Sequence, residues 1–411
     1  MKNSFKDIIK NLFLSFLSYA MPTVVLQFVI QPIMAAMLGA EANGQYLTLM
    51  SLNYFVIGIT ATVLNTVRML QDEEYKKKGL VGDFNVFFVG YAVLLAVVMP
   101  IGHILYTQSL NIVDILLYLA IALLYLYHDY IFAQYRLDLN YRKILINNII
   151  LVVGYFVGLA IFFVWQKWQI VIISAYFLGA IYDFFNTTFL REPVRRTPMF
   201  GATTKKISLL TCSHALSSVT TYCDKLILYP LLGGVSVSIY NTASIVGKML
   251  ILLSAPMNSV LLSYLVKEDS LNIKLNKRKM LFAVGLLLLA YGACVAIGFP
   301  MTSILYPKWA SSSQKYIPIT VAISTLSLVS HLLNTVVIRF YRTSFQVMIQ
   351  SINLVIYLTL SLVMMRFWSL WGFCLGGAIA GAVRLLMLLV IITRAKTPSS
   401  PEETKNEEVH V

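Results

Sequence analysis

Residues 13–37, FLSFLSYAMPTVVLQFVIQPIMAAM, form an apolar stretch that contains no charged side chain. About 20 helical residues of this kind cross a hydrocarbon core roughly 30 Å thick. Similar stretches recur along the chain, at residues 13–37, 44–66, 83–107, 109–133, 144–166, 168–190, 207–231, 235–262, 280–306, 316–338, 346–365 and 368–393. The sequence therefore predicts an all-α polytopic membrane protein with 12 transmembrane helices.

The overall composition agrees with a membrane protein. Hydrophobic residues make up 58% of the chain and charged residues only 12%, and the mean hydropathy is +0.76. These values lie far from those of a soluble domain. The net charge of +14 would suit nucleic-acid binding, but the excess lies in alternate gaps between the apolar stretches, where it sets topology and meets anionic lipid. We therefore expect membrane lipids as partners and no nucleic acid.

Lysine and arginine predict the orientation of the chain, because both are retained on the cytoplasmic side during insertion. Of the 32 basic residues, 25 lie in the N-terminal segment, in every second loop and in the C-terminal tail. The gaps on the opposite side contain only Lys167, Lys308, Lys315 and Arg366. Tryptophan prefers membrane interfaces, and the five tryptophans fall at the predicted outer rim: Trp165, Trp168, Trp309, Trp368 and Trp371. We expect both termini to be cytoplasmic.

A weak internal repeat divides the chain into halves. A shift of 194 residues superimposes Leu38, Gly39, Tyr46 and Thr48 on Leu232, Gly233, Tyr240 and Thr242. Two identical turns are expected. The linker between the halves is the loop at residues 191–206, where Pro193 and Pro198 disfavour a continuous helix.

The repeat predicts two six-helix lobes related by pseudo-twofold symmetry. We place the N-terminal lobe at residues 1–190, the cytoplasmic linker at 191–206 and the C-terminal lobe at 207–394. The tail at 395–411, which contains prolines and four glutamates, is expected to be disordered. Six-helix repeats of this kind are a known transporter plan, with the substrate path between them.

Polar side chains recur at every fourth position of the first helix in each predicted lobe. They are Ser15, Tyr19, Thr23, Gln27 and Gln31 in one helix, and Ser213, Ser217, Thr221 and Lys225 in the other. Residues four apart are neighbours on a helix surface, and polar groups in hydrocarbon are unfavourable without partners or water. Both rows are therefore expected to face a hydrated interior. The alternative is hydrogen bonding between helices without a cavity.

Three basic residues lie within predicted spans: Lys225, Lys248 and Arg384. Lys248 lies roughly 20 Å from the outer end of its helix at the usual rise per residue, so it favours substrate binding over a structural ion pair. Arg384 suits a structural or snorkelling role better. Asp224 and Asp183 are the candidate coupling or structural counter-charges. Because Asp224 and Lys225 are adjacent, we expect their side chains to point in different directions.

Motifs of enzymes are missing from the sequence. Gly247-Lys248 is followed by Met249 and lacks the upstream glycine of a phosphate-binding loop. No metal-ligand spacing, paired carboxylates or nucleophile arrangement lies outside the spans. We therefore expect no enzymatic activity, no cofactor and no metal.

Two segments carry a family resemblance. The turn Leu38-Gly39-Ala40-Glu41-Ala42-Asn43-Gly44-Gln45-Tyr46 resembles the LG-(P)-E-x-x-G-x-Y segment of the polysaccharide flippases in the multidrug/oligosaccharidyl-lipid/polysaccharide exporter superfamily. The stretch Asp224-Lys225-Leu226-Ile227-Leu228 is similar to the D-(K/R)-aliphatic stretch of the same family. The chain departs from the first pattern at Ala40, where proline is frequent. With the helix count, the resemblance covers nearly the whole chain.

The resemblance implies that the chain moves undecaprenyl-diphosphate-linked oligosaccharide to the outer leaflet of a bacterial cytoplasmic membrane, as O-antigen and capsule flippases do. It also implies alternating access and, as partners, the polysaccharide polymerase and chain-length machinery. Our hypothesis assigns the diphosphate or an anionic sugar to Lys248, Lys225 and Arg384. Sugar hydroxyls are assigned to four uncharged residues: Gln27, Gln31, Thr221 and Asn241.

Other functions remain open at this point. A multidrug or cation antiporter of the same superfamily would need acidic residues in the centre, whereas the first two helices of each predicted lobe contain only Asp224. A membrane-embedded polysaccharide polymerase would need a sizeable outer loop, but the longest outer gap is residues 307–315. A lipid II or spore-envelope flippase is a closer alternative.

Overall fold

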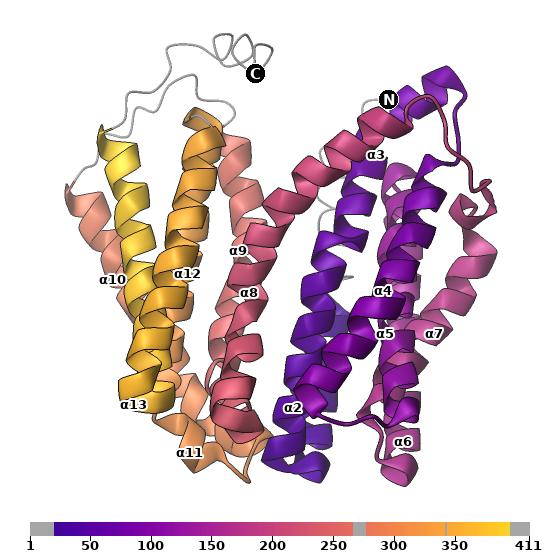
Figure 1. Cartoon of the computed structure of the whole chain (residues 1–411). Coiled ribbons are helices and arrows are strands. Elements are labelled where there is room, and N and C mark those ends of the chain that lie inside the picture. The colour runs from indigo at the N-terminus through magenta and orange to yellow at the C-terminus, as the bar shows by residue number, and fades with distance from the viewer. Residues whose placement is uncertain (1–19, 266–276, 342, 395–411) are drawn as a thin grey trace. The chain divides into compact units, whose positions relative to one another are not determined.

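Every regular element that the structure describes is helical (Figure 1). The structure is a computed structural model that describes residues 20–265, 277–341 and 343–394. Its elements are the π-helical turn η1 (Leu26–Ile30), α2 (Gln31–Ile59), α3 (Ala61–Lys78), α4 (Asp83–Thr107), α5 (Ile112–Leu137), α6 (Tyr141–Trp165), α7 (Trp168–Asn186), the short 3-10 turn η2 (Phe189–Arg191), α8 (Phe200–Ala243), α9 (Ile245–Leu265), α10 (Lys277–Leu305), α11 (Ala310–Gln314), α12 (Ile317–Phe340) and α13 (Thr343–Arg394). The predictions for Ser15, Tyr19 and the tail at 395–411 lie outside the described residues.

The chain is an all-α polytopic membrane protein. Within the described ranges, nine helical segments are long and apolar enough to cross a membrane, and three of them, Ala20–Lys78, Phe200–Ala243 and Met348–Thr393, have 59, 44 and 46 residues. Each of these three contains a break with non-helical backbone, at Gly39, Gly233 and Ser369. The breaks at Gly39 and Gly233 fall in predicted gaps between spans, whereas the break at Ser369 lies just inside the predicted span 368–393. The predicted total of 12 spans stays a prediction.

The breaks at Gly39 and Gly233 have nearly the same backbone conformation. Gly39 has φ 81° and ψ 170°, and Gly233 has φ 78° and ψ 171°. Glycine adopts these positive φ values without the steric cost that a Cβ atom brings. The prediction that the two positions, 194 residues apart, make identical turns is therefore confirmed.

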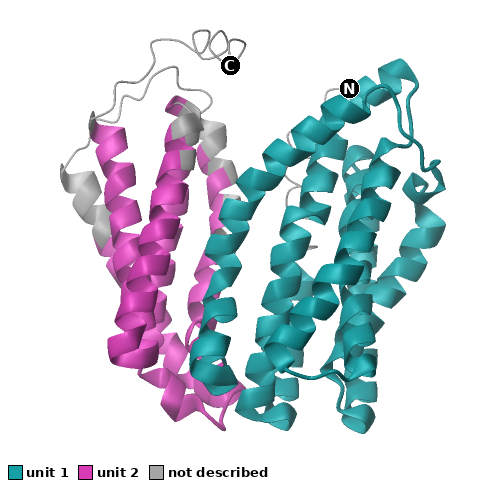
Figure 2. Ribbon diagram, in the orientation of Figure 1, with its two compact units in different colours: residues 1–237 teal, residues 238–411 magenta. Residues whose placement is uncertain are grey.

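The chain packs as two compact units, residues 1–237 and 238–411 (Figure 2). This division falls inside α8, far from the predicted linker at 191–206. Most of α8 belongs to unit 1, where the Tyr106 hydroxyl donates to the Leu226 carbonyl at 3.2 Å and the rings of Phe87 and Phe200 stack at 4.9 Å. The two predicted six-helix lobes and their pseudo-twofold symmetry stay a prediction, because the two units are defined by packing and carry no information on symmetry.

Local sequence explains where several helices begin and end. Asn111 precedes α5 and accepts the Val113 N–H at 3.0 Å, and Asn140 precedes α6 and accepts the Lys143 N–H at 3.2 Å. Such caps satisfy backbone donors that have no partner inside the helix. At its other end, α3 stops at Gly79, whose φ of 63° is left-handed.

Each unit has its own apolar core. In unit 1 the core near the ends of α3, α4 and α5 includes Leu64, Phe84, Tyr130, Phe132 and Ile144. In unit 2 a smaller core joins α12 to α13 through Val337, Tyr341, Ile349, Leu388 and Ile391.

Candidate functional site

Lys248 and Asn241 lie together in unit 2. The Lys248 ammonium donates a hydrogen bond to the side-chain oxygen of Asn241, which lies two residues before the end of α8. Asn241 is buried and Lys248 is half-buried. The sequence assigns these two residues to different parts of a substrate, whereas the structure makes them a single polar group within the membrane-spanning region.

The junction between α8 and α9 fixes the position of this Lys248 group. The helix is interrupted at Ser244, and Thr320 of α12 donates to the Ala243 carbonyl at 2.8 Å. Trp309 donates its ring N–H to the Thr242 hydroxyl at 2.9 Å. A Cβ atom on Gly247 would lie 2.2 Å from the Ser324 hydroxyl oxygen, so α9 and α12 pack closely here. Lys248 therefore projects from a backbone held by two neighbouring elements.

Lys225 and Asp224 form an ion pair in the unit 1 part of α8. The Lys225 nitrogen lies 3.3 Å from both carboxylate oxygens of Asp224, and the side chains are 10% and 13% exposed. The prediction that they point in different directions is wrong. The flexible lysine stem lets the ammonium bend back, and a largely buried charge is stabilised by pairing. This pair presents far less positive charge than a lysine alone.

The polar row on the first described helix is interrupted by the π-helical turn. Gln27 is half-buried within η1 and Gln31 is buried at the start of α2. Pro32 has no N–H to donate to the carbonyl four residues earlier, so a wider turn is favoured before it. The regular spacing of four is therefore lost, and Gln27 and Gln31 do not continue one straight row.

The corresponding row on α8 keeps its regular helical spacing, and three of its hydroxyl residues are exposed. Ser213 and Thr221 are exposed, and Ser217 between them is exposed as well, on successive turns of this membrane-length helix. The Thr221 hydroxyl donates to the Ser217 carbonyl at 2.8 Å, which satisfies its proton and leaves its oxygen able to accept. Exposed hydroxyls at this spacing give α8 one polar face.

The other two predicted charges lie elsewhere. Arg384 of α13 is half-buried near His331 of α12, and its Nε has no hydrogen-bond partner among the residues described. Asp183 of α7 is fully buried and accepts from Tyr135 of α5 at 2.8 Å and from Asn147 of α6 at 2.7 Å. Asp183 thus joins three helices of unit 1.

Glu41 makes a contact that the sequence did not predict. Its carboxylate accepts the backbone N–H groups of Gly234 at 3.0 Å and Val235 at 2.9 Å, directly after the break in α8. The first N–H groups of a helix are unpaired and carry partial positive charge, so an anion stabilises them. The signal was present, because Glu41 is the acidic residue of the turn that carries the family resemblance, but no partner was assigned to it.

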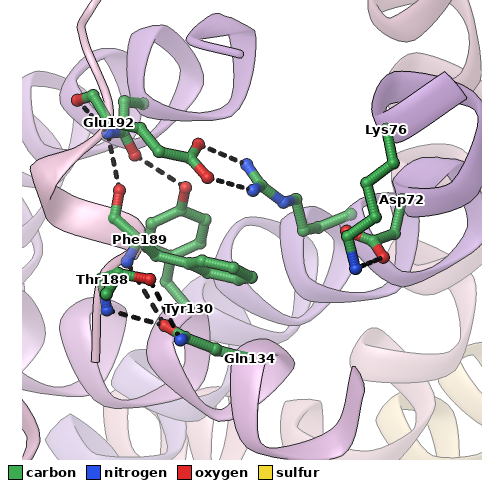
Figure 3. Close-up of polar contacts among 9 residues, drawn as sticks. Asp72, Lys76, Tyr130, Gln134, Thr188, Phe189 and Glu192 are labelled. Carbon is green, nitrogen blue, oxygen red and sulfur yellow. Dashed lines mark hydrogen bonds and ion pairs between the residues drawn. The ribbon is translucent and has the colours of Figure 1, made fainter. Parts of the chain in front are cut away.

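A second unpredicted cluster joins Arg68 of α3 to Glu192, which is labelled in Figure 3. Both carboxylate oxygens of Glu192 accept from the Arg68 guanidinium, one of them at 2.9 Å. The guanidinium carbon lies 4.7 Å from the ring centre of Phe84 and 4.1 Å from that of Phe189. Arg68 is therefore held by charge in its plane and by aromatic rings on its faces.

The same cluster fixes residues 187–199, called the linker loop below, which overlap the predicted linker at 191–206 but begin and end earlier. Asn85 of α4 donates to the carbonyls of Phe189 at 2.9 Å and Glu192 at 2.8 Å, while the Tyr130 hydroxyl donates to Asn85 at 2.7 Å. Gln134 of α5 accepts the Thr188 N–H at 2.9 Å (Figure 3). From the sequence alone, Arg68 contributes only to the predicted orientation of the chain. Nothing local to Arg68 indicates a partner 124 residues away.

The described residues contain no group of three or more His, Cys, Asp or Glu side chains that could hold a metal ion. The chain matches no protein-family model and no curated protein sequence.

Solved structures with the same fold are transporters. The lipid II flippase MurJ in an inward closed conformation superimposes with a TM-score of 0.67 at 11% identity, over 95% of this chain and 90% of MurJ. A point mutant of the Vibrio cholerae MATE transporter VcmN gives 0.61 at 13% identity, over 94% and 97%. A MOP superfamily transporter from Pyrococcus furiosus gives 0.57 at 14% identity, over 94% and 95%. The chain therefore shares the fold of these three proteins, one of which is a MOP superfamily transporter.

Proposed function

We propose that the chain is a non-enzymatic transporter that flips undecaprenyl-diphosphate-linked oligosaccharide repeat units to the outer leaflet for surface polysaccharide assembly. The observation that carries this proposal is the exposed hydroxyl row Ser213, Ser217 and Thr221 on α8. A polar face on a membrane-spanning helix is unfavourable against hydrocarbon. The row is expected to line a hydrated path that sugars can enter.

The charges that we assign to the substrate suit an anionic lipid-linked molecule. Lys248, held by Asn241, supplies an ammonium for the diphosphate, and Arg384 is a second candidate for it. Gln27, Gln31 and Thr221 offer amides and a hydroxyl to sugar hydroxyls. Lys225 is a weaker candidate than the sequence suggested, since Asp224 offsets its charge. The likeness to a lipid II flippase supports a lipid-linked substrate at the level of fold.

The topology and partners belong to the same proposal. We infer 12 spans in two six-helix lobes, a bacterial cytoplasmic membrane and cytoplasmic termini from the basic residues and the apolar stretches. Alternating access moves the substrate between the two faces. The polysaccharide polymerase and chain-length machinery are proposed to receive the exported unit.

Thiol labelling tests the hydrated row directly. In a chain whose four native cysteines are replaced, Ser217→Cys is expected to react with a water-soluble, membrane-impermeant maleimide, because water reaches the row. Val93→Cys on α4 is a matched control, since Val93 is 62% exposed but apolar and expected to face lipid. Measured by mass spectrometry, equal resistance of both positions under every transport condition would remove the basis of the proposal.

Export assays test the assigned charge. Deleting the gene should accumulate lipid-linked glycan on the cytoplasmic face, and Lys248→Ala should restore export roughly ten-fold less well than the native gene, since a charged hydrogen bond to a phosphate contributes about 1.5–3 kcal/mol. Lys77→Ala is the control, because Lys77 is exposed beside Glu73 on α3. Native glycan output from Lys248→Ala at equal protein abundance would exclude the assigned role.

A cation antiporter of the same fold is the alternative, and one observation favours it. Asp129 of α5 accepts from Thr62 at 2.8 Å, and Asp183 is fully buried in the same unit. Unit 1 therefore contains acidic side chains that cations need. Increased sensitivity to cationic drugs on gene deletion, with lipid-linked glycans normally distributed, would select the antiporter.

A further inference from the structure

The linker loop presents three arginines together with two exposed apolar side chains. Arg191, Arg195 and Arg196 are exposed, Val194 is 60% exposed and Leu190 is 38% exposed. We propose that these five residues, the arginine surface, bind the phosphate headgroups of anionic phospholipids in the adjoining leaflet. This inference depends on the packing of unit 1 and does not rest on the proposed substrate.

The backbone that carries the arginine surface is fixed from behind. Asp83 of α4 accepts the Thr197 N–H at 2.6 Å and also accepts from the Thr197 hydroxyl. Asp83 and Asn85 of α4 and Gln134 of α5 therefore bind the linker loop to these two helices. A loop that only signals topology needs positive charge but no fixed shape. This loop has both, as a preformed binding surface requires.

Packing also removes the only acid of the linker loop from the surface. Glu192 turns inward, where Arg68 neutralises it, and its side chain is 18% exposed. The exposed side chains of the loop thus include three positive charges and no acid. None of the three arginines is in an ion pair with another residue that the structure describes. An anion outside the chain can therefore approach all three.

The arginines are positioned but keep donors available. The Nε of Arg195 donates to the Val81 carbonyl at 3.3 Å, which leaves the two outer nitrogens of its guanidinium, and Arg196 lies over the Phe200 ring at 4.8 Å. A planar guanidinium with several donors matches the oxygens of a phosphate. Restricting its motion beforehand lowers the entropic cost of binding.

The apolar side chains favour a bilayer over a soluble anion. Val194 lies between the arginines in sequence, and Leu190 precedes them. Basic residues interleaved with exposed apolar ones are typical of segments that lie at a membrane interface, with charge at the phosphates and apolar groups just below them. A free phosphate or a nucleic acid would gain nothing from Val194.

Another basic segment of the chain supplies a matched comparison. Lys76, Lys77 and Lys78 of α3 pair with the acids four residues earlier, Asp72, Glu73 and Glu74, at 2.6, 3.7 and 2.7 Å. This segment has the same number of positive charges as the arginine surface, but its charge is compensated locally. Only the arginine surface should recognise phosphate headgroups.

Lipid titration of the full chain tests the proposal. Phosphatidylglycerol is added to the protein in neutral detergent micelles, and the lipid concentration that half-maximally raises the unfolding temperature is measured. The triple variant R191Q/R195Q/R196Q is expected to need roughly ten-fold or more lipid, since a basic residue near an anionic surface contributes a factor of about five. K76Q/K77Q/K78Q should change this concentration less than about two-fold on the same scale. Equal shifts in both variants would overturn the proposal, because net charge alone would then explain binding.

Two further arms identify the ligand, and the first of them does not depend on the triple variant folding. Photo-crosslinkable phosphatidylglycerol added to the native protein should modify residues 190–196, and adducts confined to other segments would overturn the proposal. Inorganic phosphate or pyrophosphate, titrated in phosphatidylcholine, should not raise the unfolding temperature. Stabilisation by these anions that is lost in R191Q/R195Q/R196Q would show a soluble-anion site instead of a lipid surface.

Discussion

Replacing Glu192 by alanine should lower the free energy of unfolding by about 3–5 kcal/mol, which is the usual cost of removing one partner from a buried ion pair. Arg68 is only 9% exposed at its side chain and lies between the rings of Phe84 and Phe189. Without Glu192, the positive charge of Arg68 stays buried among aromatic rings and loses the carboxylate that neutralises it. We expect a large drop in unfolding temperature in micelles.

The neighbouring ion pair of α3 is the control for this prediction (Figure 3). Lys76 bonds to Asp72 at 2.6 Å, but its side chain is 70% exposed, so Lys76→Ala should cost at most about 1 kcal/mol. Removing both charges in Arg68→Met/Glu192→Leu should cost less than the two single changes combined, because neither charge is left unpaired. If the double variant lost as much unfolding free energy as the two single variants together, the two charges would not be coupled.

Replacing Gly44 by alanine should destabilise unit 1 by at least about 3 kcal/mol, near the upper end for overpacking. An added Cβ atom would lie 1.9 Å from the carbonyl oxygen of Gly234 and 2.4 Å from its carbonyl carbon. These are backbone atoms of α8, which cannot rotate away as a side chain can. The two helices would have to separate, and the contacts of Glu41 with α8 would be strained.

Gly90→Ala is the matched control for Gly44→Ala. Gly90 lies inside α4 with no atom within 4 Å of an added Cβ. Alanine is favoured over glycine in a helix interior by roughly 0.5–1 kcal/mol, so this change should be neutral or stabilising. Equal unfolding temperatures for both variants would contradict the close approach of α2 and α8.

Helix positions were predictable because hydrocarbon imposes one requirement on every span. The predicted stretch at 83–107 coincides with α4, Asp83–Thr107, and the two related turns appear at Gly39 and Gly233. A spanning segment must be apolar and must satisfy its own backbone groups, so composition alone locates it. The π-helical turn before Pro32 escaped prediction, since proline within an apolar run allows a kink, a wider turn or a break.

Pairing between side chains was far less predictable than helix position. Lys225 and Asp224 were expected to diverge from adjacent positions, but the lysine stem bends back to its neighbour. Lys248 and Asn241, each proposed for substrate, form one group because the long Lys248 side chain reaches back across the junction of α8 and α9 to Asn241. Rotamers decide such contacts, and they do not follow from the order of residues.

The sequence by itself determined that this chain crosses a membrane many times as helices, where those helices lie and which two turns correspond, because apolar length and glycine conformation are local properties. Only the tertiary structure decided that α8 packs in unit 1, that Glu41 caps it, and that Glu192 turns inward to Arg68. Those contacts join residues more than 100 positions apart. Their energy comes from desolvation and from geometry that exists only once the helices have packed.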